Sequence, residues 1–279
     1  MCKAPHVSVI IPTFNRSRMV CQAVEAVLAQ TFTAFELIVA DDGSTDDTPA
    51  SLAPYADVIT LITGNTNKGV SASRNAGAAR ARGTYVAFLD SDDLWLPEKL
   101  NRQVAFFATH PEALICQTEE IWIKNGRRIN PAKKHKKPSG MIFFPSLELC
   151  LVSPSAVMMK KSFFVEMGGF DESLPACEDY DLWLRMACRY PIHLINDPLV
   201  IKRGGHGDQL SAARGLDKFR IHSLKNLIAS PHLTPAMRDA AVSVLVRKCR
   251  IYAQGCARRN RVEEAREYDR IAETAARGQ

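Results

Sequence analysis

The chain has 279 residues, of which 46% are hydrophobic and 24% are charged, so it is long enough to bury one sizeable core and an appendage. It contains no apolar run of the ~18 to 20 residues that a membrane-spanning helix needs, and residues 1–6 lack the apolar region of a signal peptide. We therefore expect a cytoplasmic protein. Its 8 cysteines form no Cys-x-x-Cys pair and no zinc spacing, which argues against a disulfide scaffold and predicts reduced thiols in the core.

The net charge of +6 arises in the C-terminal part of the chain. Residues 206–279 carry 14 basic and 8 acidic side chains, whereas residues 1–205 carry 22 of each. A basic tail on a neutral body suits an anionic membrane surface or an acidic partner. Helices that turn arginine-rich faces to solvent give the same composition and are the simpler interpretation.

Strands alternate with helices over the first ninety residues. Apolar runs predict strands at 7–11, 35–40, 58–62 and 84–89. Apolar residues at helical spacing and an alanine-rich stretch predict helices at 20–28 and 71–81. This order predicts an α/β fold of the Rossmann-like kind, with a mixed, mostly parallel sheet and helices on both faces. Such sheets bind ligands at the carboxyl ends of their strands.

Polar residues follow three of these strands directly. They are Pro12-Thr13-Phe14-Asn15, Asp41-Asp42 and Asp90-Ser91-Asp92-Asp93. These segments should converge on one crevice, where three carboxylates within four residues repel one another unless a cation or hydrogen-bond donors lie among them. Oxygen ligands alone suit Mg2+ or Mn2+. A solvated acidic turn is the alternative, which three coincident polar strand ends disfavour.

The second half of the chain adds further strands and short helices. We expect a helix at 98–109, a hairpin from 114–123 through Asn125-Gly126, a strand ending at Lys160, helices at 161–167 and 178–189, strands at 192–195 and 199–201, and a glycine-rich loop at 203–211. Residues 133–137, Lys-Lys-His-Lys-Lys, form a basic loop that we interpret as solvated and mobile. A functional loop of this charge would meet phosphate on a substrate or an anionic membrane.

The pattern beyond residue 211 is helical throughout. Helices are expected at 216–230, from Thr234-Pro235 to about 260, and at 261–276. Met237, Val244 and Ile251 recur every seven residues, so the middle helix should bury one side against the last helix or another subunit. We therefore divide the chain into an α/β domain at 1–211 and a helical extension at 212–279, through which oligomers could form.

Six short motifs occur in order along the chain. They read VIIPTFN at 9–15, VADDGS at 39–44, NKGVSASRN at 67–75, FLDSDD at 88–93, GGFDE at 168–172 and EDYDLWLR at 178–185. Together they resemble glycosyltransferase family 2, whose members have the GT-A fold, and the resemblance runs from about residue 7 to about residue 211. It implies an enzyme that moves a sugar from a nucleotide-sugar donor to a hydroxyl group.

The resemblance also implies roles for individual residues. The metal ligands would be Asp92 and, on the glycine-rich loop, His206, while Asp179 would be the general base. The nucleotide sugar would lie against Pro12, Thr13, Phe14, Asn15, Asp41, Asp42, Arg74, Asp90 and Ser91. Glu178, Trp183 and Arg185 would lie on the acceptor side. Without the resemblance, acids at 178–179 could equally complement a helix dipole, Trp183 could be core, and His206 merely exposed.

Sugar transfer needs a neutralised diphosphate, a base and aligned reactants, so we expect Mn2+ or Mg2+ as cofactor. The resemblance makes Asp42, with Asp41 as second choice, the acceptor of an N–H of the base; a carboxylate that accepts an imide N–H favours uracil, which makes a UDP-sugar the expected donor. The sequence offers no activated nucleophile, so a single displacement would invert the anomeric centre. The processive branch of the family carries a Gln-x-x-Arg-Trp motif and membrane helices, which this sequence lacks. We therefore expect addition of one sugar to a glycan or lipid-linked saccharide in polysaccharide or cell-envelope synthesis.

Other classes of protein fit parts of the pattern. A non-catalytic protein that binds sugar nucleotides or glycans could keep the fold, but the full set of acids argues against it. A nucleotidyltransferase would show a glycine-rich, basic loop after the first strand, where this chain has Pro12-Thr13-Phe14-Asn15. The absence of Gly-x-Gly-x-x-Gly and of a Walker lysine argues against dinucleotide oxidoreductases and P-loop NTPases. We expect no nucleic-acid partner, and peripheral contact with the inner membrane surface remains open.

Overall fold

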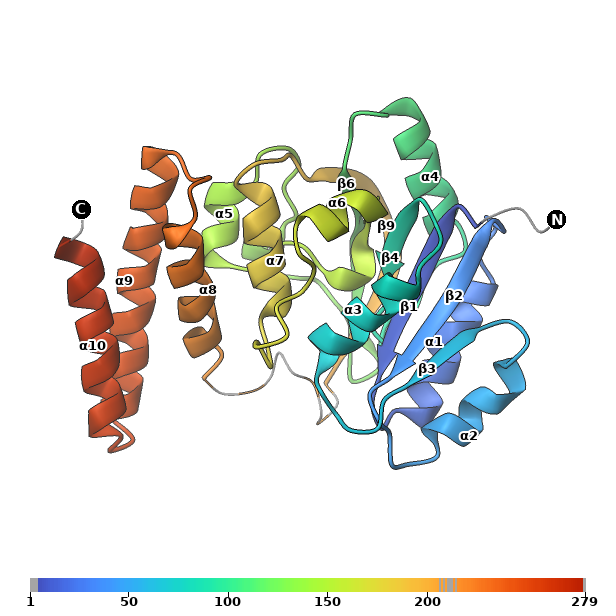
Figure 1. Ribbon diagram of the computed structural model, residues 1–279, viewed down its shortest axis with the longest axis horizontal. Coiled ribbons are helices and arrows are strands. Elements are labelled where there is room, and N and C mark those ends of the chain that lie inside the picture. The colour runs from blue at the N-terminus through green and yellow to red at the C-terminus, as the bar shows by residue number, and fades with distance from the viewer. Residues whose placement is uncertain (1–4, 206, 208, 210–212, 214, 278–279) are drawn as a thin grey trace.

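The computed structural model describes residues 5–205, 207, 209, 213 and 215–277. At its centre is a nine-stranded sheet in the order β3-β2-β1-β4-β8-β6-β9-β5, with β7 paired to β6 (Figure 1). The strands are β1 (Val7–Thr13), β2 (Phe35–Asp41), β3 (Thr60–Thr63), β4 (Tyr85–Phe88), β5 (Leu94–Trp95), β6 (Ile115–Lys124), β7 (Arg127–Ile129), β8 (Val157–Lys160) and β9 (His193–Gly204).

Most paired positions of the sheet are parallel. β1 runs parallel to β2 and β4, β2 to β3, and β6 to β9, whereas β5, β7 and β8 pair antiparallel with their neighbours. The predicted mixed, mostly parallel α/β sheet is therefore confirmed. Because β1, β2 and β4 are parallel, their carboxyl ends share one edge of the sheet, where ligand sites of such folds lie.

Helices cover both faces of the sheet. They are α1 (Ser17–Leu28), α2 (Thr48–Leu52), α3 (Val70–Arg80), α4 (Lys99–Thr109), α5 (Phe143–Glu148), α6 (Lys161–Glu166), α7 (Glu178–Ala187), α8 (Asp217–Ala229), α9 (Pro235–Ala257) and α10 (Val262–Arg277). Strand β1 shows why both faces need cover, because successive side chains of a strand point to opposite sides. Val9 and Ile11 pack in one apolar cluster with Val20 of α1, and Ile10 packs in the other with Ala78 of α3.

Helices α8, α9 and α10 lie side by side at the end of the molecule opposite the N-terminus (Figure 1). On α9 the side chains of Leu245, Cys249 and Tyr252 are buried, but Ile251 is 55% exposed, so the predicted buried stripe is wrong at that position. The buried side follows the 3.6-residue helical repeat and not the seven-residue spacing. Buried residues of α8 and α9 belong to the same apolar cluster as those of α7. The division of the chain at residue 211 stays a prediction.

Two predictions about the second half of the chain are wrong. Residues 193–204 form the single strand β9 where two strands were expected. Lys137 does not lie in a solvated loop, because its side chain is 7% exposed and pairs with Glu120. The short helix α5 and the two-residue strand β5 were not predicted.

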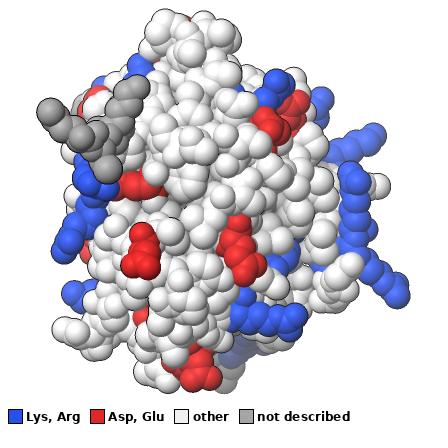
Figure 2. All heavy atoms as spheres, turned by 90° about the vertical axis from the view of Figure 1, so that its right-hand side faces the viewer, with Lys and Arg blue, Asp and Glu red and all other residues white. Residues whose placement is uncertain are grey.

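The surface shows mixed charge at the N-terminal end of the molecule. Figure 2 views this end, where Lys and Arg lie mainly around the rim and Asp and Glu are scattered between them. Among the described residues, no helix combines the length and the apolar character needed to cross a bilayer.

Candidate active site

Predicted site residues from distant parts of the chain line one cavity of about 670 Å3. Those at its surface are Pro12, Arg74, Asp90, Ser91, Asp92, Glu178 and Asp179. Pro12 lies near the end of β1, the acids at 90–92 follow β4, and the acids at 178–179 begin α7. The topology of the sheet therefore brings the segments after β1 and β4 together at one cavity, whereas Thr13, Asp41 and Asp42, predicted to join them, are not among its lining residues.

Three carboxylates gather at the end of β4. Asp90, Asp92 and Asp93 offer oxygen atoms that lie within 4.8 Å of one another. Asp93 is buried, and its two oxygens accept hydrogen bonds from Ser155 Oγ at 2.6 Å and from the backbone N–H of Arg203 at 2.9 Å. Burial and the neighbouring Asp92 raise the pKa of Asp93 to about 8. Asp93 thus anchors the turn, while Asp90 and Asp92 stay partly exposed at the cavity.

Arg74 of α3 lies buried between two of the acids. Its Nη2 donates to Asp90 and its Nη1 to Glu178, both at 2.6 Å, and its guanidinium lies 4.9 Å from the ring centre of Phe170. Burial alone would lower the pKa of Arg74, but its attraction to both carboxylates raises it. Arg74 therefore ties the end of β4 to the start of α7, a structural role beside the predicted approach to the donor diphosphate.

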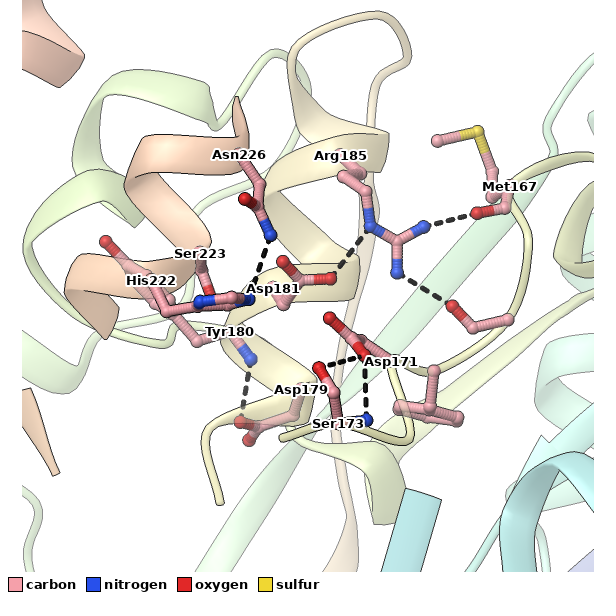
Figure 3. Close-up of polar contacts among 12 residues, drawn as sticks. Met167, Asp171, Ser173, Asp179, Tyr180, Asp181, Arg185, His222, Ser223 and Asn226 are labelled. Carbon is pink, nitrogen blue, oxygen red and sulfur yellow. Dashed lines mark hydrogen bonds and ion pairs between the residues drawn. The ribbon is translucent and has the colours of Figure 1, made fainter. Parts of the chain in front are cut away.

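Asp179 is the second residue of α7, and the N-cap residue of this helix, Cys177, has a left-handed backbone with φ of 62°. Its Oδ1 accepts a hydrogen bond from the backbone N–H of Tyr180 at 2.7 Å (Figure 3). The thiol of Cys150 donates to its Oδ2 over 3.4 Å. These two contacts hold the carboxylate at the cavity surface, where it can accept a proton.

Polar groups near the carboxyl ends of β1 and β2 shape the side expected to hold the nucleotide. The carboxylate of Asp42 accepts hydrogen bonds from the backbone N–H groups of Lys68 at 2.9 Å and Gly69 at 2.7 Å, and so fixes the turn before α3. Asp41 Oδ2 and Thr13 Oγ1 are buried and have no hydrogen-bond partner among the described residues. Since buried polar atoms are nearly always hydrogen-bonded, a polar ligand bound at the ends of β1 and β2 would supply the missing hydrogen bonds. We call this place the nucleoside corner.

Phe14 and Asn15, also predicted on the nucleotide side, are not in the cavity lining either. Phe14 is 36% exposed. Asn15 has a left-handed backbone with φ of 51°, and its Oδ1 accepts a hydrogen bond from the backbone N–H of Thr45 at 2.8 Å. His206, the predicted second metal ligand, lies outside the described residues.

The structure does not bring Trp183 or Arg185 to the cavity. Trp183 is 1% exposed and packs edge to face against Phe170, with ring centres 6.1 Å apart. Arg185 points away from Asp179 (Figure 3), with its Nε 2.8 Å from Asp181 and its Nη2 2.7 Å from the carbonyl oxygen of Gly169. Both side chains thus stabilise the packing of α7.

The cavity contains charged residues that the sequence did not reveal. Burial alone would lower the pKa of Lys202 on β9, but Glu120 and Asp93 surround its ammonium and raise it. Arg16 Nη1 lies 3.2 Å from Asp92. Arg16 directly follows the first motif and could have been found there. The cavity residues on β6 and β9 lie in none of the six motifs. They reach the cavity because these two strands, which are far apart in the sequence, pair in the sheet.

A model of the family described as glycosyl transferase family 2 matches residues 8–168. The chain therefore belongs to glycosyltransferase family 2, and the predicted family is confirmed.

Proteins with related sequences are named as glycosyltransferases. The chain is 30% identical over 191 residues to UDP-Glc:alpha-D-GlcNAc-diphosphoundecaprenol beta-1,3-glucosyltransferase WfgD of Escherichia coli, covering 68% of this chain and 73% of that protein. It is 26% identical over 268 residues to an uncharacterized glycosyltransferase of Haemophilus influenzae, covering 84% and 87%. It is 28% identical over 216 residues to an uncharacterized glycosyltransferase of Rickettsia felis, of which it spans 35% of the length, against 74% of its own.

Solved structures share the fold at low sequence identity. Residues 1–349 of TarS from S. aureus in complex with UDP-GlcNAc superpose with a TM-score of 0.73 at 20% identity, covering 98% of this chain and 92% of that one. The mannosyltransferase PcManGT from Pyrobaculum calidifontis in complex with GDP-Man and Mn2+ gives a TM-score of 0.57 at 18% identity, covering 99% and 85%. These likenesses confirm the predicted GT-A fold.

Proposed function

We propose that the protein transfers one sugar from a UDP-sugar to a hydroxyl group of a glycan or lipid-linked glycan, with inversion at the anomeric carbon. The observation that carries this proposal is the shared cavity, which is lined by the acids after β4 and by the acids that begin α7. Membership of family 2 supports the reaction class. The donor named for WfgD and the ligand of the TarS complex support a UDP-sugar.

A divalent cation fits the acidic cluster because the donor atoms are carboxylate oxygens alone, which Mg2+ and Mn2+ prefer. We assign Asp92 as the direct ligand, with Asp90 beside it and His206 as a second ligand. When bound, such an ion neutralises the negative charge of the departing diphosphate. The Mn2+ in the PcManGT complex is consistent with this assignment.

Asp179 is the residue that we assign as general base. Its neighbour Glu178 is committed to Arg74 at 2.6 Å, whereas Asp179 is held by one backbone N–H and one thiol. A carboxylate in this position can take the proton of the acceptor hydroxyl as the oxygen attacks. The sugar's bond to the diphosphate breaks on the opposite side, which inverts the anomeric centre.

We place the nucleoside against Pro12, Thr13 and the ends of β1 and β2. Asp42 was the first choice to accept the uracil imide N–H, but its oxygens already accept two backbone hydrogen bonds. Asp41 Oδ2 is buried without a partner among the described residues. We therefore now favour Asp41 as the acceptor.

Residues 1–211 would form the catalytic domain and residues 212–279 a helical extension. WfgD is named for an acceptor linked to diphosphoundecaprenol, which supports a lipid-linked acceptor for this chain as well. We propose that the protein works on the cytoplasmic side and contacts the inner membrane surface peripherally. Its basic C-terminal part, with 14 basic and 8 acidic side chains over residues 206–279, suits anionic lipids.

The test compares Asp92→Ala with Asp179→Asn. Thermal shift with UDP and Mn2+ reports donor binding, since a ligand that binds only the folded state raises the melting temperature. Transfer to a screened panel of acceptors reports turnover. We expect Asp92→Ala to lose the Mn2+-dependent shift, and Asp179→Asn to keep the shift and lose transfer. EDTA should abolish transfer by the unaltered protein, and added Mn2+ should restore it.

The two assignments can fail separately. If Asp179→Asn leaves the transfer rate within about threefold, a change of less than ~1 kcal/mol in the barrier, the general base lies elsewhere. If Asp92→Ala keeps the full Mn2+-dependent shift, the metal assignment is wrong. A protein that shows no shift with UDP, GDP or dTDP in the presence of Mn2+ would not be a nucleotide-sugar transferase.

A further inference from the structure

One wall of the cavity is built around a buried ion pair. Lys137 Nζ lies 2.9 Å from Glu120 Oε1, and the two side chains are 7% and 2% exposed. The same ammonium donates a hydrogen bond to the carbonyl oxygen of Thr118 at 2.9 Å. A buried ion pair often adds little to stability because both charges lose their water. Its clearest effect here is to fix residues 130–140 against β6.

The ion pair also fixes an aromatic side chain at the cavity. Trp122 of β6 donates its indole N–H to the second oxygen of Glu120 at 2.9 Å. The ring of His135 lies 5.1 Å from the indole, tilted by 57°, and Lys202 Nζ lies 5.9 Å from its centre. Trp122, His135 and Lys202 all line the cavity. The indole is therefore held in place and is not a side chain that moves freely in solvent.

Trp122 differs from the other two tryptophans of the chain. Trp95 and Trp183 are 3% and 1% exposed and belong to the apolar core. Trp122 is half-buried and lines a cavity of polar and charged groups. A rigid aromatic ring with hydrogen-bonding groups around it is the usual way in which ligand pockets fix an amphipathic ligand. The apolar C–H face and the hydroxyl groups of a pyranose ring match such a surface.

The position of this wall in the sheet indicates which sugar it would meet. Trp122 and Lys202 line the same cavity as Asp179, so this wall faces the space into which the proposed base also points. Strand β6 is three positions from β1 in the sheet, or about 14 Å at ~4.8 Å per strand. The nucleoside corner lies at β1 and β2, on the far side of the acidic cluster.

We propose that Trp122, held by the Lys137–Glu120 ion pair, is the platform on which the acceptor's pyranose ring lies, with Lys202 as a hydrogen-bond donor to its hydroxyl groups. The proposal rests on the proposed function, because Asp179 defines the acceptor side. It also gives the basic segment 133–137 a role, since Lys137 anchors the wall and His135 supports the ring.

Acrylamide quenching of tryptophan fluorescence tests whether the sugar binds on Trp122, because Trp122 is the one tryptophan that a quencher can reach readily. The protein is saturated with UDP and Mn2+ and titrated with the methyl glycosides of glucose, galactose, mannose and N-acetylglucosamine. We expect at least one of these sugars to shield Trp122. Failure of all four to shield it would overturn the proposal, as would shielding by UDP alone, which would place the nucleobase on the indole.

Ligand-observed NMR titration of the same sugars tests how much the indole ring of Trp122 contributes to the affinity for the sugar. In Trp122→Ala the Kd for the sugar should rise about five- to tenfold, which corresponds to ~1 to 1.4 kcal/mol. In Trp122→Phe, which keeps an aromatic ring, the Kd should stay within about twofold of the unaltered protein's. This variant also tests the proposal if Trp122→Ala does not fold. The control Phe144→Ala removes a 51% exposed aromatic ring of α5 outside the cavity lining and should leave the Kd unchanged. An unchanged Kd in Trp122→Ala would overturn the proposal.

The thermal shift with UDP and Mn2+ is read in every sample. Its absence from the unaltered protein would refute the proposed function itself. Its presence, together with an unshielded Trp122, would refute the platform alone.

Discussion

The guanidinium of Arg74 neutralises two carboxylates in a place that water hardly reaches. Replacing it by methionine would leave the buried Glu178 and the partly exposed Asp90 without their shared partner. Removal of one member of a buried ionic group costs about 3 to 5 kcal/mol. We therefore expect Arg74→Met to lower the free energy of unfolding by that amount, measured by urea denaturation.

An exposed ion pair provides the matched control. Arg266 pairs with Glu263 at 2.8 Å, and the two side chains are 69% and 86% exposed. Exposed pairs contribute roughly 0 to 1 kcal/mol, so Arg266→Met should cost much less than Arg74→Met. Equal losses in the two variants would show that the burial of Arg74 does not matter to stability. The double variant Arg74→Met/Glu178→Gln should recover part of the loss, because one unpaired charge is removed.

Glu120 should make stability depend on pH in the acid range. Burial opposes its charge, but Lys137 and Lys202 face it and lower its pKa to about 2. An unfolded glutamate has a pKa of ~4.3, so between about pH 4 and pH 2 the unfolded chain takes up a proton that the folded one does not. This stabilisation is complete above pH ~4.3 and is lost as pH falls, by up to ~1.4 kcal/mol per pH unit.

Urea denaturation at several pH values checks this dependence. Glu120→Gln lacks this pH-dependent stabilisation. The variant should therefore be less stable than the unaltered protein at neutral pH, where Lys137 is left unpaired. Its stability should then fall less steeply below about pH 4. Parallel slopes for the two proteins would contradict the assignment.

At the scale of single residues, short motifs predicted part of the site. The other site residues were not predicted, because contacts between distant parts of the chain place them there. Asp92 and Asp179 were found because each lies in a motif beside a strand or helix end, and both line the cavity. Lys137 was predicted to be solvated because its neighbours in the sequence are all basic. Its partner Glu120 lies 17 residues away on β6, and only the folded chain brings the two charges together.

The helix α9 begins with a cap that the sequence identified. Thr234 Oγ1 accepts a hydrogen bond from the backbone N–H of Met237 at 3.2 Å, and Pro235 occupies the first helical position. Thr234→Ala should lower the free energy of unfolding by ~1 kcal/mol because one helix N–H loses its acceptor. Urea denaturation measures the loss, and Thr234→Ser, which keeps a hydroxyl, should recover most of it. A full loss in the serine variant would show that the methyl group matters and not the cap.

Most strands and helices were predicted within a few residues, and the exceptions have physical causes. β9 was predicted as two strands because two apolar runs, at 192–195 and 199–201, are separated by Asn196, Asp197 and Pro198. In the structure Pro198 lies where the register between β6 and β9 shifts, and a proline is tolerated at such an irregularity because no ladder N–H is needed. The helix α5 was missed because it has six residues, one of them proline, too few for a helical repeat to show.

At the scale of the whole molecule, the sheet and the C-terminal helices share one apolar cluster. Leu224 of α8 is fully buried in the cluster that also contains Trp183 and Leu184 of α7. Leu224→Ala should lower the free energy of unfolding by about 2 to 5 kcal/mol. We expect the loss to destabilise the α/β part as well, since the two parts share this packing.

Tryptophan fluorescence can test this coupling because residues 206–279 contain no tryptophan. If the two parts unfold together, Leu224→Ala should shift the urea midpoint equally by fluorescence and by far-UV circular dichroism. Ile251→Ala, at a 55% exposed position of α9, should leave both midpoints nearly unchanged. A fluorescence midpoint that does not move in Leu224→Ala would mean that the helices form an independent unit.

The order of strands and helices was predictable because each element has its own periodicity. The packing of α8 on α7 was not, because it depends on side chains such as Leu224 that any amphipathic helix would carry. The motifs predicted the elements around β1, β2 and β4, whereas the remaining contacts join side chains that lie far apart in the sequence.

The two ends of the main sheet bear on how the protein behaves at high concentration. The outermost strands in the sheet order are β3 and β5, with four and two residues. A long open edge offers unpaired N–H and C=O groups on which strands of other molecules can assemble. The short β3 gives few such groups, but β5 pairs only with Val200 and Ile201 of the 12-residue strand β9. Association between native molecules at high concentration would therefore involve the edge of β9 beside β5 and not that of β3.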